Sequence, residues 1–217
     1  MAAVDKYVIY DDVNFIKGGW INRNRILLEK KPKYFNVQLI GAGSYKKINE
    51  IEVENDKHIV NKKLRMIEAA YRKAPFYADV YTILKSILEC DKKNLVEYIR
   101  NSFEAIGKYL GITTELIYSS SLDKNCSLKG SEKILAICKL LGATEYYNAI
   151  GGEKLYSFYD FLQNGIELKF LKTNNIIYKQ YGETFYPNLS IIDVMMFNSR
   201  EEVKKMLGEY TLIINKR

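Results

Sequence analysis

The second half of the chain alternates between short strand-like segments and segments with helical periodicity, and this order constrains the fold more than any other feature. Strands are expected at 115–118, 145–149, 166–171 and 210–214, with helices at 131–141 and 156–163. Two more helices are expected to begin at capping boxes, one formed by Ser190 and Asp193 and one by Ser199 and Glu202. Because parallel strands need a long crossover, usually a helix, this order predicts an α/β fold with a mixed, largely parallel sheet covered by helices.

The first half of the chain has a different pattern. Strand-like runs at 6–10, 25–28, 34–40 and 48–53 are separated by short turns, which is more typical of antiparallel pairing. Helical periodicity follows from about residue 59 to 89, broken at Pro75, and again up to Gly111, with Asp91 as the expected N-cap. An α+β fold is therefore the alternative.

The length of 217 residues and the apolar content of 47% suit a single domain spanning 1–217. There is no apolar run long enough to cross a bilayer and no signal peptide at the start, so we expect a cytoplasmic protein. The net charge of +7 comes largely from lysine pairs spread along the chain, which favours a solvated surface over a nucleic-acid patch. Cys138 is expected to be buried and Cys126 accessible.

Polar residues follow three of the expected strands. They are Asp11-Asp12, the serines 119–121, and the segment from Asn148 to Gly151-Gly152. Ligands of open α/β sheets bind at the carboxyl ends of the strands, so these segments would form one crevice if they meet. Carboxylates suit an amine, a hydroxyl or a metal, whereas serine hydroxyls and glycine amides suit phosphate oxygens. The alternative for each segment is a plain turn.

Two further candidates stand elsewhere in the sequence. Trp20, Asn22, Arg23 and Arg25 lie within six residues after a Gly-Gly pair. Arginine pairs with phosphate or carboxylate and indole stacks on a sugar or a base, although a hairpin turn with surface arginines has the same pattern. His58, the one histidine, is a candidate general base or an exposed residue at a helix start. With one histidine, a zinc site is not expected.

Several strings resemble the WbqC-like family of bacterial surface-polysaccharide (O-antigen) gene clusters. They are Asp5–Lys17, Trp20–Ile26, Tyr71–Tyr77, Ser120–Leu122, Leu141–Tyr147 followed by Gly151, Gly152 and Tyr156, and Leu189–Asp193. The resemblance covers nearly the whole chain. Family members usually open with a Gln-Pro segment that has no counterpart ahead of Asp5, and a chain without it is expected to be less stable or inactive if that segment builds part of the site.

The resemblance implies lipopolysaccharide-type glycan biosynthesis, with transfer of an acyl or aminoacyl group to a nucleotide-linked amino sugar as the expected reaction. The partners would be a nucleotide-sugar and an acyl-thioester donor or carrier protein. Asp11 or Asp12 would orient or deprotonate the amine, and Ser120 would donate to an oxyanion. A non-catalytic binding or scaffold protein and an ATP- and magnesium-dependent ligase are the alternatives, and neither a cofactor nor an oligomeric state is assigned.

The remaining candidates are expected to bind the substrate. On this interpretation Arg23 and Arg25 hold phosphate or carboxylate oxygens, and the tyrosines shape the pocket. The full set of expected substrate-binding residues is Trp20, Asn22, Arg23, Arg25, Tyr71, Tyr77, Tyr147, Gly151, Gly152 and Tyr156.

Overall fold

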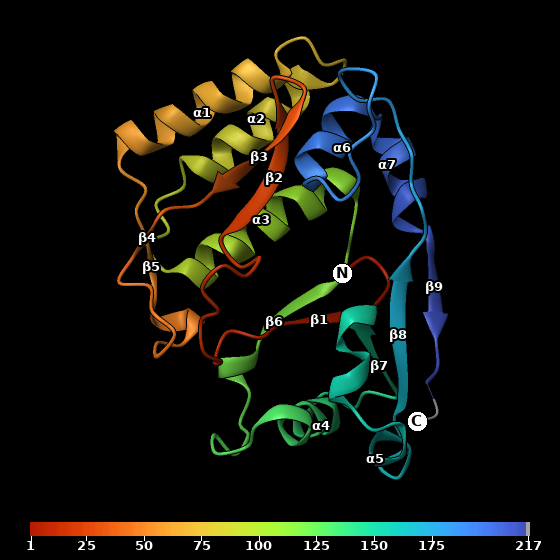
Figure 1. The fold of residues 1–217 in the computed structure, drawn as a ribbon. Coiled ribbons are helices and arrows are strands. Elements are labelled where there is room, and N and C mark those ends of the chain that lie inside the picture. The colour runs from red at the N-terminus through yellow and green to blue at the C-terminus, as the bar shows by residue number, and fades with distance from the viewer. Residues whose placement is uncertain (216–217) are drawn as a thin grey trace.

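The protein is a mixed α/β structure, described for residues 1–215 by a computed structural model (Figure 1). The strands are β1 (Lys6–Ile9), β2 (Arg23–Leu28), β3 (Lys31–Asn36), β4 (Leu39–Ile40), β5 (Glu52–Val53), β6 (Glu115–Tyr118), β7 (Glu145–Ala149), β8 (Glu167–Thr173) and β9 (Tyr210–Ile213). The α-helices are α1 (Lys57–Tyr71), α2 (Tyr77–Leu88), α3 (Leu95–Leu110), α4 (Gly130–Leu140), α5 (Phe158–Leu162), α6 (Ile191–Phe197) and α7 (Arg200–Leu207). Three 3-10 turns complete the order: η1 (Ile48–Glu50), η2 (Ser119–Ser121) and η3 (Ile150–Leu155).

The strands form small separate sheets, which corrects the expectation of one largely parallel sheet. β1 pairs with β6 and β7 with β8 in parallel, whereas β2–β3, β4–β5 and β8–β9 are antiparallel. Alternating strand and helix segments predicted the parallel pair β7–β8, whereas β1, expected among antiparallel strands, pairs in parallel with β6. Among residues 1–215, no strand pairing joins β1–β6 to the sheet of β7, β8 and β9, so the two parallel pairs stay separate.

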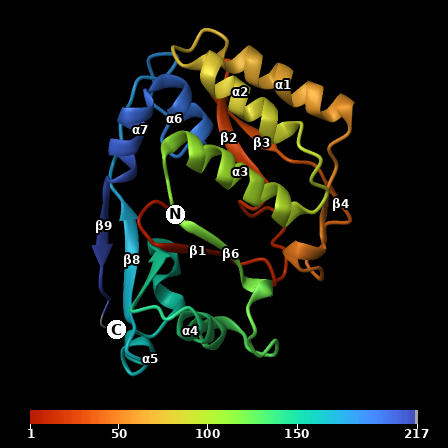
Figure 2. The ribbon, with the colours of Figure 1, turned by 180° about the vertical axis from the view of Figure 1, so that it is seen from behind.

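The parallel pair β1–β6 lies between two hydrophobic cores (Figures 1 and 2). The large core joins α1, α2, α3, α6 and the β2–β3 hairpin around Ile26, Ile67 and Met195. The small core joins α4, α5 and β8 around Phe161 and Phe170. The views from front and back agree that the helices of the large core lie on one side of β1–β6, with α4, α5 and β7 on the other. The loops at the ends of β1 and β6 therefore contact both halves.

Most of the expected helices and strands are confirmed, and the differences have local causes. The N-cap of α3 is Asn94, whose side chain accepts from two backbone amides of the first turn, and not Asp91. α4 begins before Ser131, so Ser131 lies within the helix. The segment 48–53, expected as one strand, is η1 followed by the two-residue β5.

The two expected capping boxes have different outcomes. Ser199 and Glu202 form one at the start of α7, with each side chain bonding the other residue's backbone amide. Ser190 caps α6 through its hydroxyl, but the Asp193 side chain turns into the protein and accepts hydrogen bonds from the Tyr71 and Tyr178 hydroxyls instead. The Asp193 carboxylate is therefore a buried acceptor for two tyrosines, and the expected capping box at the start of α6 does not form.

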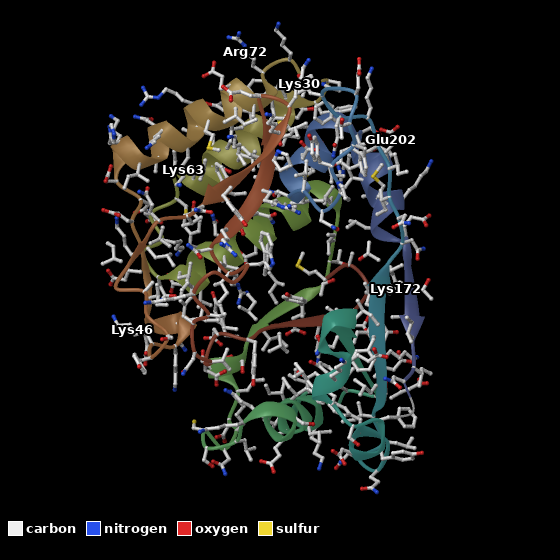
Figure 3. The ribbon with its side chains drawn as sticks, viewed as in Figure 1. Lys30, Lys46, Lys63, Arg72, Lys172 and Glu202 are labelled. Atoms are coloured by element: carbon white, nitrogen blue, oxygen red, sulfur yellow. The ribbon has the colours of Figure 1, made fainter. Side chains whose placement is uncertain are left out.

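The positive charge is distributed over the outside of the molecule. Figure 3 shows the labelled side chains Lys30, Lys46, Lys63, Arg72 and Lys172 on different elements around the periphery. This agrees with the spread of lysine pairs along the sequence. No helix within residues 1–215 is long and apolar enough to span a membrane.

Candidate functional site

The ends of β1 and β6 bring two of the three predicted polar segments together. The strands run parallel with Ile9 opposite Tyr118, so two further residues along each chain place Asp11 beside Ser120. Parallel strands present their carboxyl ends at the same edge, so the pairing of β1 with β6 brings together two of the polar segments that follow strands in the sequence. We call the group Asp11, Asp12, Ser119, Ser120, Lys124 and Lys133 the aspartate centre.

Asp11 is buried, with 2% of its surface exposed, and both of its carboxylate oxygens accept hydrogen bonds. The Ser120 hydroxyl donates to one oxygen at 2.5 Å and the Ser120 amide donates to the other at 2.8 Å. The Asn49 side-chain amide donates to the carboxylate from η1 at 3.2 Å. A buried carboxylate needs such donors to offset its desolvation, and here none of them carries a positive charge.

Asp12 has cationic partners instead. The ammonium groups of Lys133 and Lys124 lie 2.9 and 3.0 Å from one of its oxygens. The Ser119 hydroxyl donates to the other oxygen at 2.7 Å. Burial disfavours the charged carboxylate, but the hydrogen bonds from Lys133, Ser119 and Lys124 outweigh it and hold the pKa of Asp12 at about 2. Asp12 therefore stays ionised at neutral pH and is a very weak base.

Lys133 links this centre to the small core. Its ammonium group donates to the Asp12 carbonyl at 3.1 Å and lies 5.0 Å from the centre of the Tyr10 ring. Burial, with further contributions from the charges of Asp12 and Tyr156, raises the pKa of Tyr10 to about 12, so its hydroxyl is neutral. α4 thus carries a buried lysine into the loop after β1.

Ser120 is the member of the centre that solvent reaches most freely, since it is an exposed residue whereas Asp11 and Ser119 are buried. Its single hydroxyl proton is already donated to Asp11. The remaining lone pairs of the oxygen make it an acceptor toward solvent. This geometry suits proton acceptance from a substrate and relay to Asp11 better than the expected donation to an oxyanion.

The third predicted segment forms contacts of its own. Gly152 lies against the Asn148 side chain, so close that a Cβ atom there would be 2.8 Å from its amide nitrogen. Gly151 faces open space. Within residues 1–215, no hydrogen bond joins either glycine to Asp11, Asp12 or Ser120. Hydrogen bonds therefore join the first two predicted segments to each other, and the two glycines of the third take no part in them.

Two expected site tyrosines belong to the neighbourhood of β7. The Tyr147 hydroxyl donates to Glu145 at 2.6 Å, and Lys169 bonds the same carboxylate. Tyr156 packs edge-on against Tyr146 and Phe161 in the small core. Tyr147 and Tyr156 thus both make contacts within the protein that stabilise the region around β7.

The Trp20 segment forms a separate surface on the β2–β3 hairpin. Trp20 and Tyr34 are 60% and 53% exposed, and the centres of their rings lie 6.3 Å apart. The Arg23 guanidinium lies over both rings, at 5.2 and 4.9 Å from their centres. We call Trp20, Arg23, Arg25 and Tyr34 the hairpin surface.

The polar side chains of this segment differ in how many hydrogen bonds they make within the protein. Asn22 donates to the Val37 carbonyl at 2.8 Å and fixes the start of the hairpin. Arg23 donates to the Gly19 carbonyl at 2.9 Å and to the Gly18 carbonyl. Arg25 makes one long hydrogen bond, 3.3 Å, to the Asn188 carbonyl, and its Nε atom is buried without a partner.

The remaining predicted site residues lie apart from the aspartate centre. Tyr71 is fully buried and bonds Asp193 and the Leu27 amide. Tyr77 stacks on Tyr81 at the start of α2, with ring centres 5.0 Å apart. His58 is exposed in the first turn of α1, where its amide donates to the Asp56 cap. The structure therefore gives His58 the position of a residue at a helix start, the alternative named from the sequence.

Four residues of these two sites were not predicted from the sequence: Asn49, Lys124, Lys133 and Tyr34. Lys133 and Asn49 lie more than thirty residues from their partners, so the sequence carries no local signal for them. Tyr34 was recoverable in principle, because a two-residue turn at 29–30 places it opposite Arg25.

No group of three or more histidine, cysteine, aspartate or glutamate residues within 1–215 is arranged to hold a metal ion. The oxygens of Asp11 and Asp12 are occupied by serine, asparagine and lysine donors.

Comparison with known proteins confirms the resemblance. Residues 1–205 match the WbqC-like protein family. The chain is 30% identical over 213 residues to the uncharacterized protein Rv1507c of Mycobacterium tuberculosis (strain ATCC 25618 / H37Rv), covering 95% of this chain and 89% of that protein. No solved structure matches the chain.

Proposed function

The chain belongs to the WbqC-like protein family, and from that premise we propose that it acts in surface-glycan biosynthesis by transferring an acyl or aminoacyl group to the amine of a nucleotide-linked amino sugar. The observation that carries the proposal is the exposed Ser120 hydroxyl bonded at 2.5 Å to the buried carboxylate of Asp11. Transfer to an amine requires removal of a proton as the new bond forms, and this pair offers a path for it.

The proposed reaction balances with an acyl thioester as the donor. The sugar amine attacks the thioester carbonyl, a C–N bond forms and the C–S bond breaks. The amine proton passes to the Ser120 oxygen while the Ser120 proton passes to Asp11. The same proton then returns through Ser120 to the departing thiolate, which restores the ionised carboxylate.

The other residues of the centre have positioning roles in this proposal. Asp12, with a pKa near 2, holds Lys124 and Lys133 and does not take a proton. Asn49 donates to Asp11 from the large-core side, at 3.2 Å. Asp11 is therefore held by neutral donors, and no ammonium group is among its hydrogen-bond partners within residues 1–215.

The decisive experiment compares Ser120→Ala with Ser121→Ala. Both serines are exposed members of η2, but the Ser121 hydroxyl donates to the Tyr118 carbonyl and not to Asp11. Each variant is incubated with an acyl-thioester donor and a UDP-linked amino sugar, and the product is measured by mass spectrometry. We expect kcat to fall by about 10²–10⁴-fold in Ser120→Ala and to stay within about twofold in Ser121→Ala. Equal activity of Ser120→Ala and the wild type refutes the proposed role.

A non-catalytic binding protein is the second candidate, and one observation favours it. The ionic groups of Asp12, Lys124 and Lys133 are satisfied by one another, as in a structural cluster that joins two parts of a fold. If this is the function, the wild-type protein binds its ligand without turnover of any thioester donor. The ATP- and magnesium-dependent ligase is the least favoured candidate, because serine, asparagine and lysine donors already occupy the oxygens of Asp11 and Asp12.

A further inference from the structure

The β2–β3 hairpin has one face in the large core, and its other face is buried at Leu27 but reaches solvent at Tyr34. Ile26 and Phe35 lie on the core face and are buried. The antiparallel register places Arg25 directly opposite Tyr34, and residues opposite each other share a face. Arg25 and Tyr34 therefore stand together on the other side, where Trp20 joins them.

Arg23 holds the two exposed rings in place. Its Nε atom donates to the Gly19 carbonyl at 2.9 Å, and the guanidinium lies over both Trp20 and Tyr34. Arg23 also donates to the Gly18 carbonyl. The turn that presents the two carbonyls needs a glycine at position 18, where the φ of +73° is unfavourable for other residues. Arg23 is thus committed to the protein itself, and the rings form a preorganised flat surface.

Arg25 is the free cation of this surface. A guanidinium has five N–H donors, yet the structure gives it one long bond to the Asn188 carbonyl, 3.3 Å, and its Nε atom is buried without a partner. Within residues 1–215 no carboxylate lies within salt-bridge distance of it. The guanidinium therefore has terminal N–H groups left to donate to a ligand.

The charge around Arg25 selects the kind of ligand. Residues 13–28 include Lys17, Arg23 and Arg25 but no aspartate or glutamate, so an anion meets an excess of positive charge there. The indole of Trp20, 5.9 Å from the Arg25 guanidinium, supplies a stacking face next to the free donors. A flat ring that carries a phosphate group matches both features, whereas a neutral ring would leave Arg25 unpaired.

We propose that the hairpin surface binds a nucleoside diphosphate, with the base stacked on Trp20 and phosphate oxygens paired with Arg25. Tyr34 extends the stacking face, and Arg23 positions both rings without contacting the ligand. The proposal rests on the proposed function in one respect: if the substrate is a nucleotide-linked sugar, this surface would hold its nucleotide part. Binding itself is independent of any transfer reaction.

The single tryptophan makes the test specific to this site. Because Trp20 is the only indole in the chain, its fluorescence reports stacking at the hairpin surface directly. Uridine diphosphate is titrated into the wild-type protein, with free N-acetyltryptophanamide as the inner-filter control. We expect saturable quenching by uridine diphosphate and weaker binding, by at least tenfold, of glucose 1-phosphate and inorganic pyrophosphate. Absence of saturable quenching, or equal binding of glucose 1-phosphate, overturns the proposal.

The variants separate site binding from general charge attraction. Arg25→Gln and Lys33→Gln each remove one positive charge from the hairpin, but Lys33 lies opposite Ile26, on the face away from Tyr34. We expect the dissociation constant to rise about tenfold or more in Arg25→Gln and less than twofold in Lys33→Gln. Equal effects of the two variants overturn the proposal.

Two further variants complete the design. Trp20→Ala, followed by calorimetry, is expected to weaken nucleotide binding about tenfold or more. Ser120→Ala is expected to bind the nucleotide as the wild type does, even though the proposed reaction is lost. Loss of activity in Ser120→Ala without loss of binding keeps the two proposals separable. Normal calorimetric binding by Trp20→Ala refutes the nucleotide site alone.

Discussion

Replacing Asp12 with asparagine should destabilise the protein strongly, because within residues 1–215 its carboxylate is the one acidic group within salt-bridge distance of two buried lysines. The Lys124 and Lys133 side chains are only 2% and 6% exposed. Asparagine keeps the shape of aspartate but removes the charge, so both ammonium groups stay buried without compensation. Breaking a buried ion pair in this way costs about 3–5 kcal/mol.

The lowered pKa of Asp12 corresponds to a cost of the same order. The carboxyl group has a pKa of about 2 in the folded protein against an ordinary value of 3.8. Each unit of pKa shift corresponds to about 1.4 kcal/mol, so ionised Asp12 contributes about 2 kcal/mol to the folded state. Since the folded-state pKa is the lower one, this stabilisation is present above about pH 4 and is lost as the pH falls toward 2. The expected loss of unfolding free energy in Asp12→Asn at pH 7 is therefore about 2–5 kcal/mol.

Urea denaturation at pH 7 measures this loss, with Asp123→Asn as the matched control. Asp123 is an exposed aspartate beside Lys124 in sequence, and its replacement is expected to change stability by less than about 0.5 kcal/mol. Adding Lys133→Met to Asp12→Asn should restore part of the loss, because one unpaired ammonium is then removed. A loss below about 1 kcal/mol in Asp12→Asn, or no recovery in the double variant, refutes the reasoning.

Three further predictions concern other parts of the fold. Tyr71→Phe removes a hydroxyl that bonds a buried carboxylate at 2.8 Å, and chemical denaturation should show a loss of about 1–3 kcal/mol. Burial raises the pKa of Cys138 to about 11, so a thiol reagent at pH 8 should label exposed Cys126 in the native protein and Cys138 only after unfolding, as read by mass spectrometry. Gly111→Ala should lower stability by about 1 kcal/mol in the same denaturation assay, because the φ there is +68°, whereas Gly151→Ala, which meets open space, should be nearly neutral.

The sequence predicted the elements of this fold better than their arrangement. Amphipathic periodicity located α1 to α3, and Gly111 marked the end of α3 through its left-handed conformation. Strand-helix alternation in the second half of the chain correctly predicted the parallel pair β7–β8, whereas the antiparallel pattern of the first half did not predict the parallel pairing of β1 with β6. It did not predict that the pairs stay separate, because that depends on which short strands find partners after the helices have packed.

The same division holds for the candidate sites. Asp11 and Ser120 each follow a strand, so the sequence indicated that they would meet if those two strands paired in parallel, and the pairing of β1 with β6 supplies that condition. The Lys133 partner of Asp12 comes from a helix 121 residues away, and no spacing rule connects them. Arg23 and Arg25 look equivalent in sequence, yet one bonds backbone carbonyls and the other is largely unpaired.

The adjacent aspartates differ in chemistry because their neighbours differ in charge. Asp12 accepts from two ammonium groups, which lower its pKa and make it a permanent anion that joins the loop after β1 to α4 and to the turn after β6. Asp11 accepts from neutral donors and lies one hydrogen bond from solvent through Ser120. A carboxylate that is fixed by cations cannot act as a base at neutral pH, and one that faces a hydroxyl can exchange a proton through it. Asp12 therefore stabilises the aspartate centre, whereas Asp11 and Ser120 carry its proposed reactivity. Asp12→Asn should mainly lower the free energy of unfolding, and Ser120→Ala should mainly lower kcat.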